Sequence, residues 1–129
     1  MSNTFIRWAA VLGALSVLIG AFGAHALKPF LSADALMTYE TGVKYQMFHA
    51  LALLGVGILR QKFPHPLIRY SGHCFIIGVV LFSGSLYVLT LLKATSSIGL
   101  GGLGLVTPVG GLFLISGWLL LLGGLKQPS

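Results

Sequence analysis

The chain has 129 residues, enough for one domain, and 56% of them are apolar whereas only 8% are charged. A soluble domain carries roughly 25% charged residues, so this composition excludes a protein whose whole surface faces water. The net charge of +6 comes from Lys and Arg that stand singly at the ends of apolar runs, which excludes the basic and aromatic clusters of a nucleic-acid-binding surface.

Four apolar runs follow one another along the chain. A helix needs about 20 residues to cross the hydrocarbon of a bilayer. The second run is apolar only from Tyr45, and it reaches this length if its helix begins near Thr41. The sequence therefore predicts an all-α membrane protein, a four-transmembrane-helix bundle in a single integral membrane domain over residues 1–129, with spans at about 5–26, 42–60, 68–92 and 105–125.

The connection between the first two spans holds both acidic residues, Asp34 and Glu40. Ser32 can cap a helix there, and Leu36 and Tyr39 would share one face of it. This pattern predicts a short amphipathic helix on the membrane surface between spans one and two. In the fourth run, Thr107 is a suitable cap for a helix that begins at Pro108, the alternative being a proline kink inside a longer helix.

The distribution of Lys and Arg predicts the orientation of the chain. With four spans, both termini and the middle connection share one side of the membrane, and five cations lie near that side against three near the other. The side richer in Lys and Arg is normally cytoplasmic. We therefore expect both termini in the cytoplasm and, for a bacterial chain, a location in the plasma (inner) membrane.

Small residues recur at helical spacing in three of the spans. Gly110, Gly117 and Gly124 follow at seven-residue steps, Ser16 and Gly20 at a four-residue step, and span three contains Gly78. Small residues let helix backbones approach closely in lipid, where burial of apolar surface does not drive association. These stripes predict a tight bundle, and they also permit a homo-oligomer.

Polar residues of all four spans gather in one leaflet when each is placed by its distance from the span end. They lie on the side opposite the termini and must find partners there, because lipid supplies none. The sequence leaves two interpretations open: the cluster packs the bundle, or it binds a small molecule or a lipid. The candidate polar cluster comprises His25, Glu40, Tyr45, Gln46, His49, Ser83, Ser85, Tyr87 and Thr107.

Two more specific functions of the candidate polar cluster would depend on its histidines. His49 with Glu40 could carry protons in a small transporter, and His25 with His49 could bind haem or a metal. A zinc site would lack further ligands, because acidic residues are scarce. The sequence contains no Ser-His-Asp set, phosphate loop or acid pair at a plausible depth, so it predicts a non-enzymatic protein without a cofactor. The partner that it predicts is the lipid bilayer.

Four motifs in this order resemble one known family. They are GAFGAH at 20–25, ETGVKYQMFH at 40–49, LFSGSLY at 81–87 and TPVGG at 107–111. Together they resemble the YgdD/YwdK family of small uncharacterised four-span membrane proteins. The resemblance implies four spans and the bacterial inner membrane, and it implies no activity, substrate or cofactor.

Overall fold

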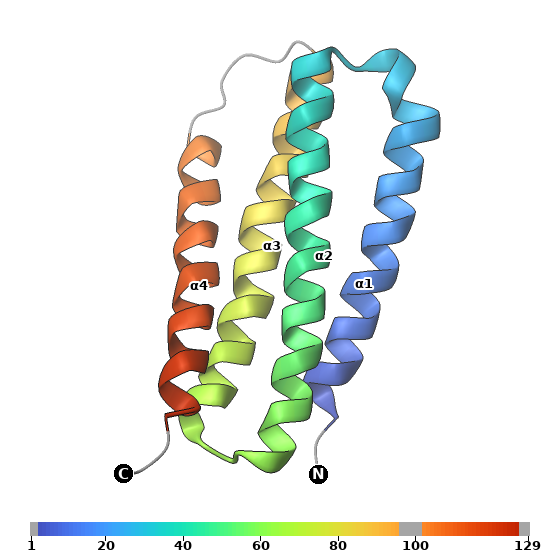
Figure 1. Ribbon diagram of the computed structural model, residues 1–129. Helices are drawn as coiled ribbons and strands as arrows, with labels where there is room; N and C mark the ends of the chain where they lie inside the picture. Colours follow the sequence, from blue (N-terminus) through green and yellow to red (C-terminus); the bar gives the residue numbers. More distant parts are fainter. Residues whose placement is uncertain (1–2, 96–101, 127–129) are drawn as a thin grey trace.

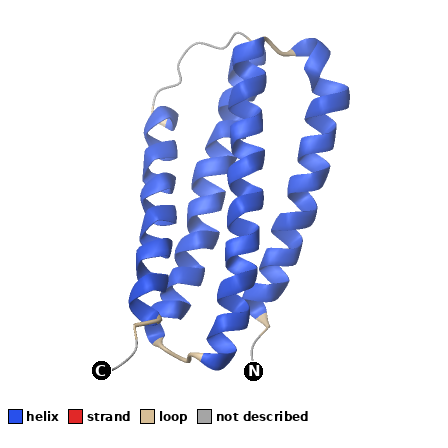
Figure 2. Ribbon diagram, viewed as in Figure 1, coloured by secondary structure: helices blue, strands red, loops and turns tan. Residues whose placement is uncertain are grey.

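The structure, a computed structural model, describes residues 3–95 and 102–126 and is helical over nearly all of them (Figures 1 and 2). Four helices are long and apolar enough to cross a membrane, as predicted. Their bounds are α1 Thr4–Phe22, α2 Ala33–Lys62, α3 Pro66–Ala94 and α4 Leu103–Gly124. A π-helical turn, Gly23–Leu27, and a 3-10 turn, Lys28–Phe30, continue α1 towards α2.

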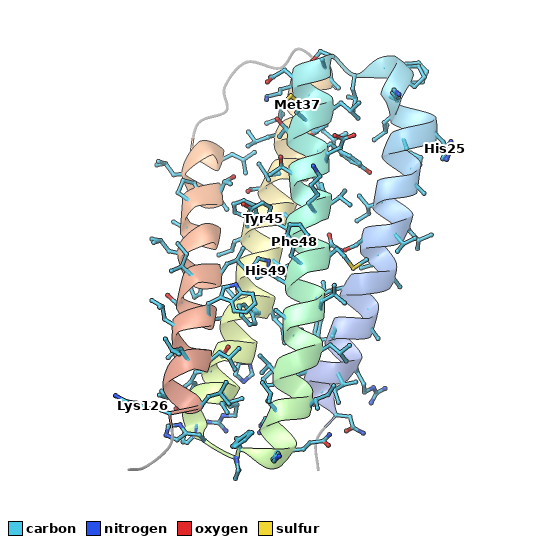
Figure 3. The ribbon with its side chains drawn as sticks, viewed as in Figure 1. His25, Met37, Tyr45, Phe48, His49 and Lys126 are labelled. Carbon is cyan, nitrogen blue, oxygen red and sulfur yellow. The ribbon has the colours of Figure 1, made fainter. Side chains whose placement is uncertain are left out.

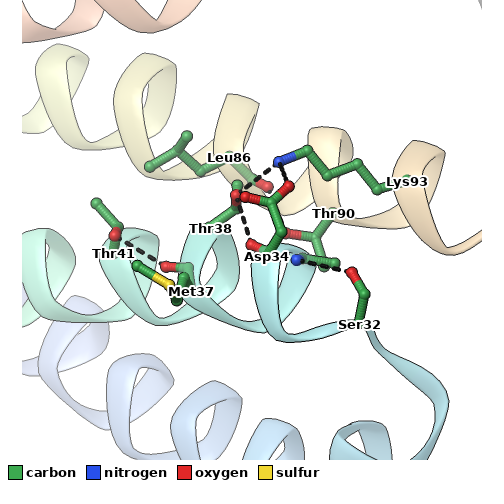
Figure 4. Close-up of polar contacts among 9 residues, drawn as sticks. Ser32, Asp34, Met37, Thr38, Thr41, Leu86, Thr90 and Lys93 are labelled. Carbon is green, nitrogen blue, oxygen red and sulfur yellow. Dashed lines mark hydrogen bonds and ion pairs between the residues drawn. The ribbon is translucent and has the colours of Figure 1, made fainter.

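The segment expected to form a separate surface helix is the beginning of α2. Ser32 caps it as predicted, accepting a hydrogen bond from the Ala35 amide at 3.1 Å, but the helix then runs unbroken to Lys62. Asp34 and Thr38 in these first turns both bind Lys93 of α3 at 2.9 Å (Figure 4). The segment is thus part of α2 and contacts α3, and α2 is longer than the predicted span 42–60.

The start of α4 also differs from the main expectation. The helix begins at Leu103, so Pro108 lies inside it and Thr107 is not its cap. The Thr107 hydroxyl hydrogen-bonds the Ser85 hydroxyl of α3 instead. Pro108 removes one backbone donor near the helix start, where the cost is lower than in the helix middle.

The helices pack in chain order, α1 on α2, α2 on α3 and α3 on α4, with α1 and α4 at opposite edges (Figure 1). The glycines of α4 make the closest contact. A Cβ on Gly117 would lie 2.6 Å from the Phe75 ring, and one on Gly124 would lie 2.5 Å from Ile68. Gly78 of α3 receives Leu114 in the same way. The small residues of spans three and four therefore bring these two helices together.

The interior changes character from one end to the other. The apolar core lies in the half nearer the termini, where Leu53, Val56, Ile68 and Phe75 are fully buried. The opposite half is filled by polar side chains of α2 and α3, which hydrogen-bond across the helices. The candidate polar cluster belongs to this second half.

Candidate functional site

Gln46 connects three helices. It lies on α2, is 4% exposed, and its amide nitrogen donates to the Leu12 carbonyl of α1 at 2.9 Å. Its amide oxygen accepts from the Tyr87 hydroxyl of α3 at 2.6 Å. One side chain thus uses its donor and its acceptor towards two different helices. Such bonds are favoured in lipid because no water can replace either partner.

Two serines of α3 bind the neighbouring helices on either side. Ser83 is buried and donates to the Gly42 carbonyl of α2 at 2.7 Å. Ser85, two residues later, hydrogen-bonds Thr107 of α4 and also donates to the Phe82 carbonyl. Nearer the termini, Ser71 donates to the Gly117 carbonyl of α4 at 2.6 Å. Serine hydroxyl groups of α3 therefore form hydrogen bonds with both neighbouring helices, α2 and α4.

His49 lies between α2, α3 and α4 and is 6% exposed. The indole Nε1 of Trp118 on α4 donates to its Nε2 at 3.1 Å, so that nitrogen must be an acceptor. Its Nδ1 then carries the proton and donates to the Tyr45 carbonyl at 2.8 Å. These two bonds describe a neutral imidazole with the proton on Nδ1. A second proton on Nε2 would oppose the Trp118 N–H.

Three of the nine predicted residues lie outside this network of side-chain bonds. His25 is exposed on the π-helical turn and points away from the other helices (Figure 3). Glu40 is exposed and lines a hollow between α1 and α2. Tyr45 contributes its carbonyl to His49, and its ring lies 4.8 Å from that of Phe82.

The structure keeps apart the residues of the two paired roles suggested by the sequence. His25 and His49 do not approach each other, because His25 faces outwards and both His49 nitrogens have protein partners. Glu40 lines the hollow with α1, whereas His49 binds Trp118 of α4, so these two residues face different neighbouring helices. Within residues 3–95 and 102–126, no group of three metal-binding side chains occurs.

The polar network is complete in the part of the chain that the structure describes. Every buried side-chain nitrogen or oxygen there has a hydrogen-bond partner. A binding site would normally keep donors or acceptors free to meet its ligand. This network can fix the relative positions of all four helices, but it offers no free polar group to a ligand.

Free polar groups lie instead in the seam between α1 and α2. A hollow of about 240 Å³ is lined by Gly20 of α1, by Gly23 and Ala24 of the π-helical turn, and by Leu36, Tyr39, Glu40, Val43 and Lys44 of α2. Neither Glu40 nor Lys44 forms an ion pair, the only one among the described residues being Lys93 with Asp34. A carboxylate and an ammonium group therefore face a cavity with apolar walls.

The π-helical turn shapes this hollow. The Tyr39 ring packs where a side chain of Gly23 would stand, so a larger residue there would clash. The Tyr39 hydroxyl donates to the Ile19 carbonyl, just before α1 widens into the π turn. π turns of this kind occur frequently at functional sites, because they reorient side chains within a continuous helix.

Comparison with known proteins places these features in a family. Residues 19–111 match the family described as "Protein of unknown function (DUF423)". The chain belongs to this family. It is 40% identical to UPF0382 inner membrane protein YgdD of Escherichia coli K12, over 95% of this chain and 89% of the relative. No solved structure matches the chain.

Two further relatives show that the similarity extends along the whole DUF423 chain. UPF0382 membrane protein SH2409 of Staphylococcus haemolyticus is 40% identical over 92% of this chain and 91% of its own length. A UPF0382 membrane protein of Haemophilus influenzae is 36% identical over 100% and 99%. The resemblance seen in the sequence motifs is confirmed, and so is the membrane character of the chain.

Sequence reasoning missed three residues that matter to this DUF423 structure. Trp118, which orients His49, was passed over in a strongly apolar run, although an indole N–H at membrane depth needs an acceptor. Tyr39 is predicted as part of the surface helix, and Lys44 is not among the candidate site residues, yet both line the hollow between α1 and α2. The four-residue spacing of Glu40 and Lys44 was the signal that could have placed both on one face of α2.

Proposed function

We propose that this protein is a non-enzymatic membrane protein that binds a zwitterionic phospholipid in the seam between α1 and α2. The observation that carries the proposal is the pairing of Glu40 and Lys44 at one apolar hollow, with neither side chain engaged inside the protein. An ammonium group of the lipid would meet the carboxylate, and its phosphate would meet the lysine. The completed polar network is the scaffold that holds this seam in place.

The depth of the hollow suits a headgroup. Glu40 and Arg60 are twenty residues apart on α2, which corresponds to about 30 Å of helix, the thickness of the hydrocarbon core. With Arg60 at one boundary, Glu40 lies at the other. Lys44 lies one turn deeper, and its flexible stem can carry the ammonium group back to the boundary.

The seam also offers a place for an acyl chain. A second hollow, of about 140 Å³, lies between the same two helices nearer the termini, and its lining is almost wholly apolar. The α2 residues of the two hollows continue one another at helical spacing, through Val43, Met47, Leu51 and Leu54. A lipid with its headgroup at Glu40 could therefore lay a chain along the same groove.

The positions of the Lys and Arg residues in the structure support the orientation predicted from the sequence. The end with the termini carries Arg7, Arg60, Lys62, Arg69 and Lys126, so we place it in the cytoplasm and the lipid seam in the opposite leaflet. For a bacterial chain this is the outer leaflet of the inner membrane.

The proposal can be tested by native mass spectrometry of the detergent-purified protein with phosphatidylethanolamine and phosphatidylcholine. These lipids differ in that only the first has ammonium N–H groups to donate to Glu40. We expect wild type to prefer phosphatidylethanolamine about fivefold, the ratio given by ~1 kcal/mol for a partly exposed charged pair. Glu40→Gln should lose this preference, and Lys44→Gln should bind both lipids more weakly.

Matched controls remove the same charges outside the hollow. The controls are Asp34→Asn and Lys28→Gln. Both residues lie at the same end of the bundle but do not line the hollow. Both should retain the preference of wild type. Equal binding of the two lipids by wild type, or the same loss in Asp34→Asn as in Glu40→Gln, would refute the proposed site.

A further inference from the structure

The end of the bundle that carries the termini has an unbalanced positive charge. Both acidic side chains of the sequence, Asp34 and Glu40, lie at the other end. At the connection between α2 and α3, Arg60 and Arg69 therefore have no carboxylate side chain within reach. Among the described residues, no acidic side chain neutralises these two arginines.

The two arginines converge on one hollow. It has a volume of about 240 Å³ and is lined by Arg60 from the last turns of α2, Arg69 from the first turn of α3, and the connecting Pro64, His65 and Pro66. The two prolines restrict the backbone of this connection. The Phe63 amide donates to the Leu59 carbonyl at 2.7 Å, and the His65 amide donates to the Phe63 carbonyl at 2.8 Å. The walls of the hollow are thus held by a short, rigid turn.

Aromatic rings hold both guanidinium groups. The Arg60 guanidinium lies 5.4 Å from the centre of the Phe5 ring of α1, and that of Arg69 lies 5.4 Å from the Tyr70 ring. Stacking on a ring restrains a planar guanidinium and leaves its N–H groups at the edge free to donate. Neither arginine forms an ion pair with a described residue.

His65 adds a third donor. It is the cap of α3, and its Nδ1 accepts from the Leu67 amide at 3.1 Å. Because Nδ1 is the acceptor in this bond, the proton of the ring is on Nε2. Arg60, Arg69 and His65 therefore line one hollow, and each of these side chains carries N–H donors.

We propose that Arg60, Arg69 and His65 form a binding site for a phosphate group at the turn between α2 and α3. Guanidinium groups bind phosphate oxygens in bidentate fashion, which a flexible lysine cannot do. Two sources share this chemistry: the headgroup of an anionic phospholipid in the adjoining leaflet, and free phosphate in solution. This site is independent of the seam between α1 and α2, from which it is separated by the thickness of the membrane.

The experiment measures binding of phosphatidylglycerol and of inorganic phosphate to the full-length protein in detergent. The test variant is Arg60→Gln with Arg69→Gln, and the matched control is Arg7→Gln with Lys62→Gln, which removes two cations from the same end but none from this hollow. We expect the test variant to bind the phosphate group about tenfold more weakly and the control less than twofold. Arg60→Lys keeps the charge but not the planar fork, so it should lose part of the affinity.

The two ligands identify the source of the phosphate group. Binding of phosphatidylglycerol that excess inorganic phosphate does not displace indicates a lipid site, and displacement indicates a site for soluble phosphate. Equal losses in the two double variants would overturn the proposal, because they would show a diffuse positive surface. So would full affinity in Arg60→Lys, or unchanged binding in the test variant with its helix content preserved.

Discussion

The buried polar side chains of this protein bind backbone carbonyls and polar side chains within the bundle. Gln46, Ser83 and Ser85 use their side chains to bind carbonyls or hydroxyls of the neighbouring helices, and His49 is held by Trp118. In lipid, each of these groups would be costly without its partner. The individual bonds are nevertheless modest, averaging about 0.6 kcal/mol in measured membrane proteins. The network contributes through the number of its bonds and through the relative positions it imposes.

The central residue of the network gives the clearest prediction. Gln46→Leu removes the bonds to the Leu12 carbonyl and the Tyr87 hydroxyl, so it should lower the free energy of unfolding by about 1–2 kcal/mol. Gln61→Leu, an exposed position on the same helix, should change it by less than about 0.5 kcal/mol. Chemical unfolding in detergent measures both, and equal effects would contradict the role of Gln46.

His49 should exist as one tautomer. Nitrogen chemical shifts of the labelled protein are expected to show the proton on Nδ1 and an unprotonated Nε2 at neutral pH, because Trp118 donates to Nε2. Trp118→Phe removes that donor, so His49 should no longer prefer the tautomer with the proton on Nδ1. A proton on Nε2 in wild type would show that the indole bond does not form.

His49→Ala should also lower the stability of the bundle. The substitution leaves the Trp118 N–H and the Tyr45 carbonyl without this partner, and we expect a loss of about 1–2 kcal/mol. A thermal melt in detergent is the measurement, and an unchanged midpoint would argue against a structural role for His49.

For single residues, the sequence predicted depth along the helix better than hydrogen-bond partners. Distance from the span ends predicted that Gln46, His49, Ser83 and Thr107 lie at similar depth, and in the structure they lie in the half of the bundle away from the termini. It could not say which pairs bond, because that depends on how each helix is rotated about its axis. His25 shows the limit most plainly, since its depth was close to that of the cluster but its helix turns it outwards.

Among the elements, α3 and α4 pack closely because their glycines leave room for the backbone and the large apolar side chains of the facing helix. Gly110 brings α4 against the backbone of Phe82, and Gly117 and Gly124 receive Phe75 and Ile68. Close approach of this kind gains van der Waals contact in lipid, where the hydrophobic effect does not favour helix pairing. The seven-residue spacing keeps the glycines on one face along the whole of α4.

Replacing glycine by alanine should change the stability of the protein in opposite directions at packed and at open positions. A Cβ on Gly110 would overlap the Phe82 backbone, so Gly110→Ala should destabilise the protein by about 1–3 kcal/mol. Gly84 has open space beside it, so Gly84→Ala should stabilise the helix by up to about 1 kcal/mol. Thermal melts in detergent distinguish these results, and a change of the same sign in both would contradict the packing described here.

The elements that differ from the sequence prediction do so because of contacts between helices. Local signals at Ser32 correctly marked the start of a helix, but that helix continues unbroken through α2, and its first turn binds Lys93 of α3. Pro108 is a helix start by local preference, yet α4 begins earlier and Thr107 binds Ser85. Such tertiary contacts leave no mark on a local sequence pattern.

The whole molecule has two unlike ends. One carries the termini, the apolar core and a concentration of cations, and the other carries the polar network, both acids and the hollow at Glu40. Half-buried Gly13 of α1 has open space beside it, and self-association stays a prediction from the small-residue stripes of the sequence.

The charge difference between the ends predicts an orientation that can be measured. A green fluorescent protein fused to the C-terminus should fluoresce in cells, and alkaline phosphatase fused there should be inactive, because we expect that terminus in the cytoplasm. The opposite pair of results would place the lipid seam in the cytoplasmic leaflet.

The most direct test of the account separates the scaffold from the lipid site. Thermal midpoints of wild type, Gln46→Leu and Glu40→Gln would be measured in detergent, with and without phosphatidylethanolamine. We predict that Gln46→Leu melts earlier than wild type but is still stabilised by the lipid, whereas Glu40→Gln melts like wild type without lipid and gains nothing from it. Loss of the lipid effect in Gln46→Leu together with its retention in Glu40→Gln would contradict the account.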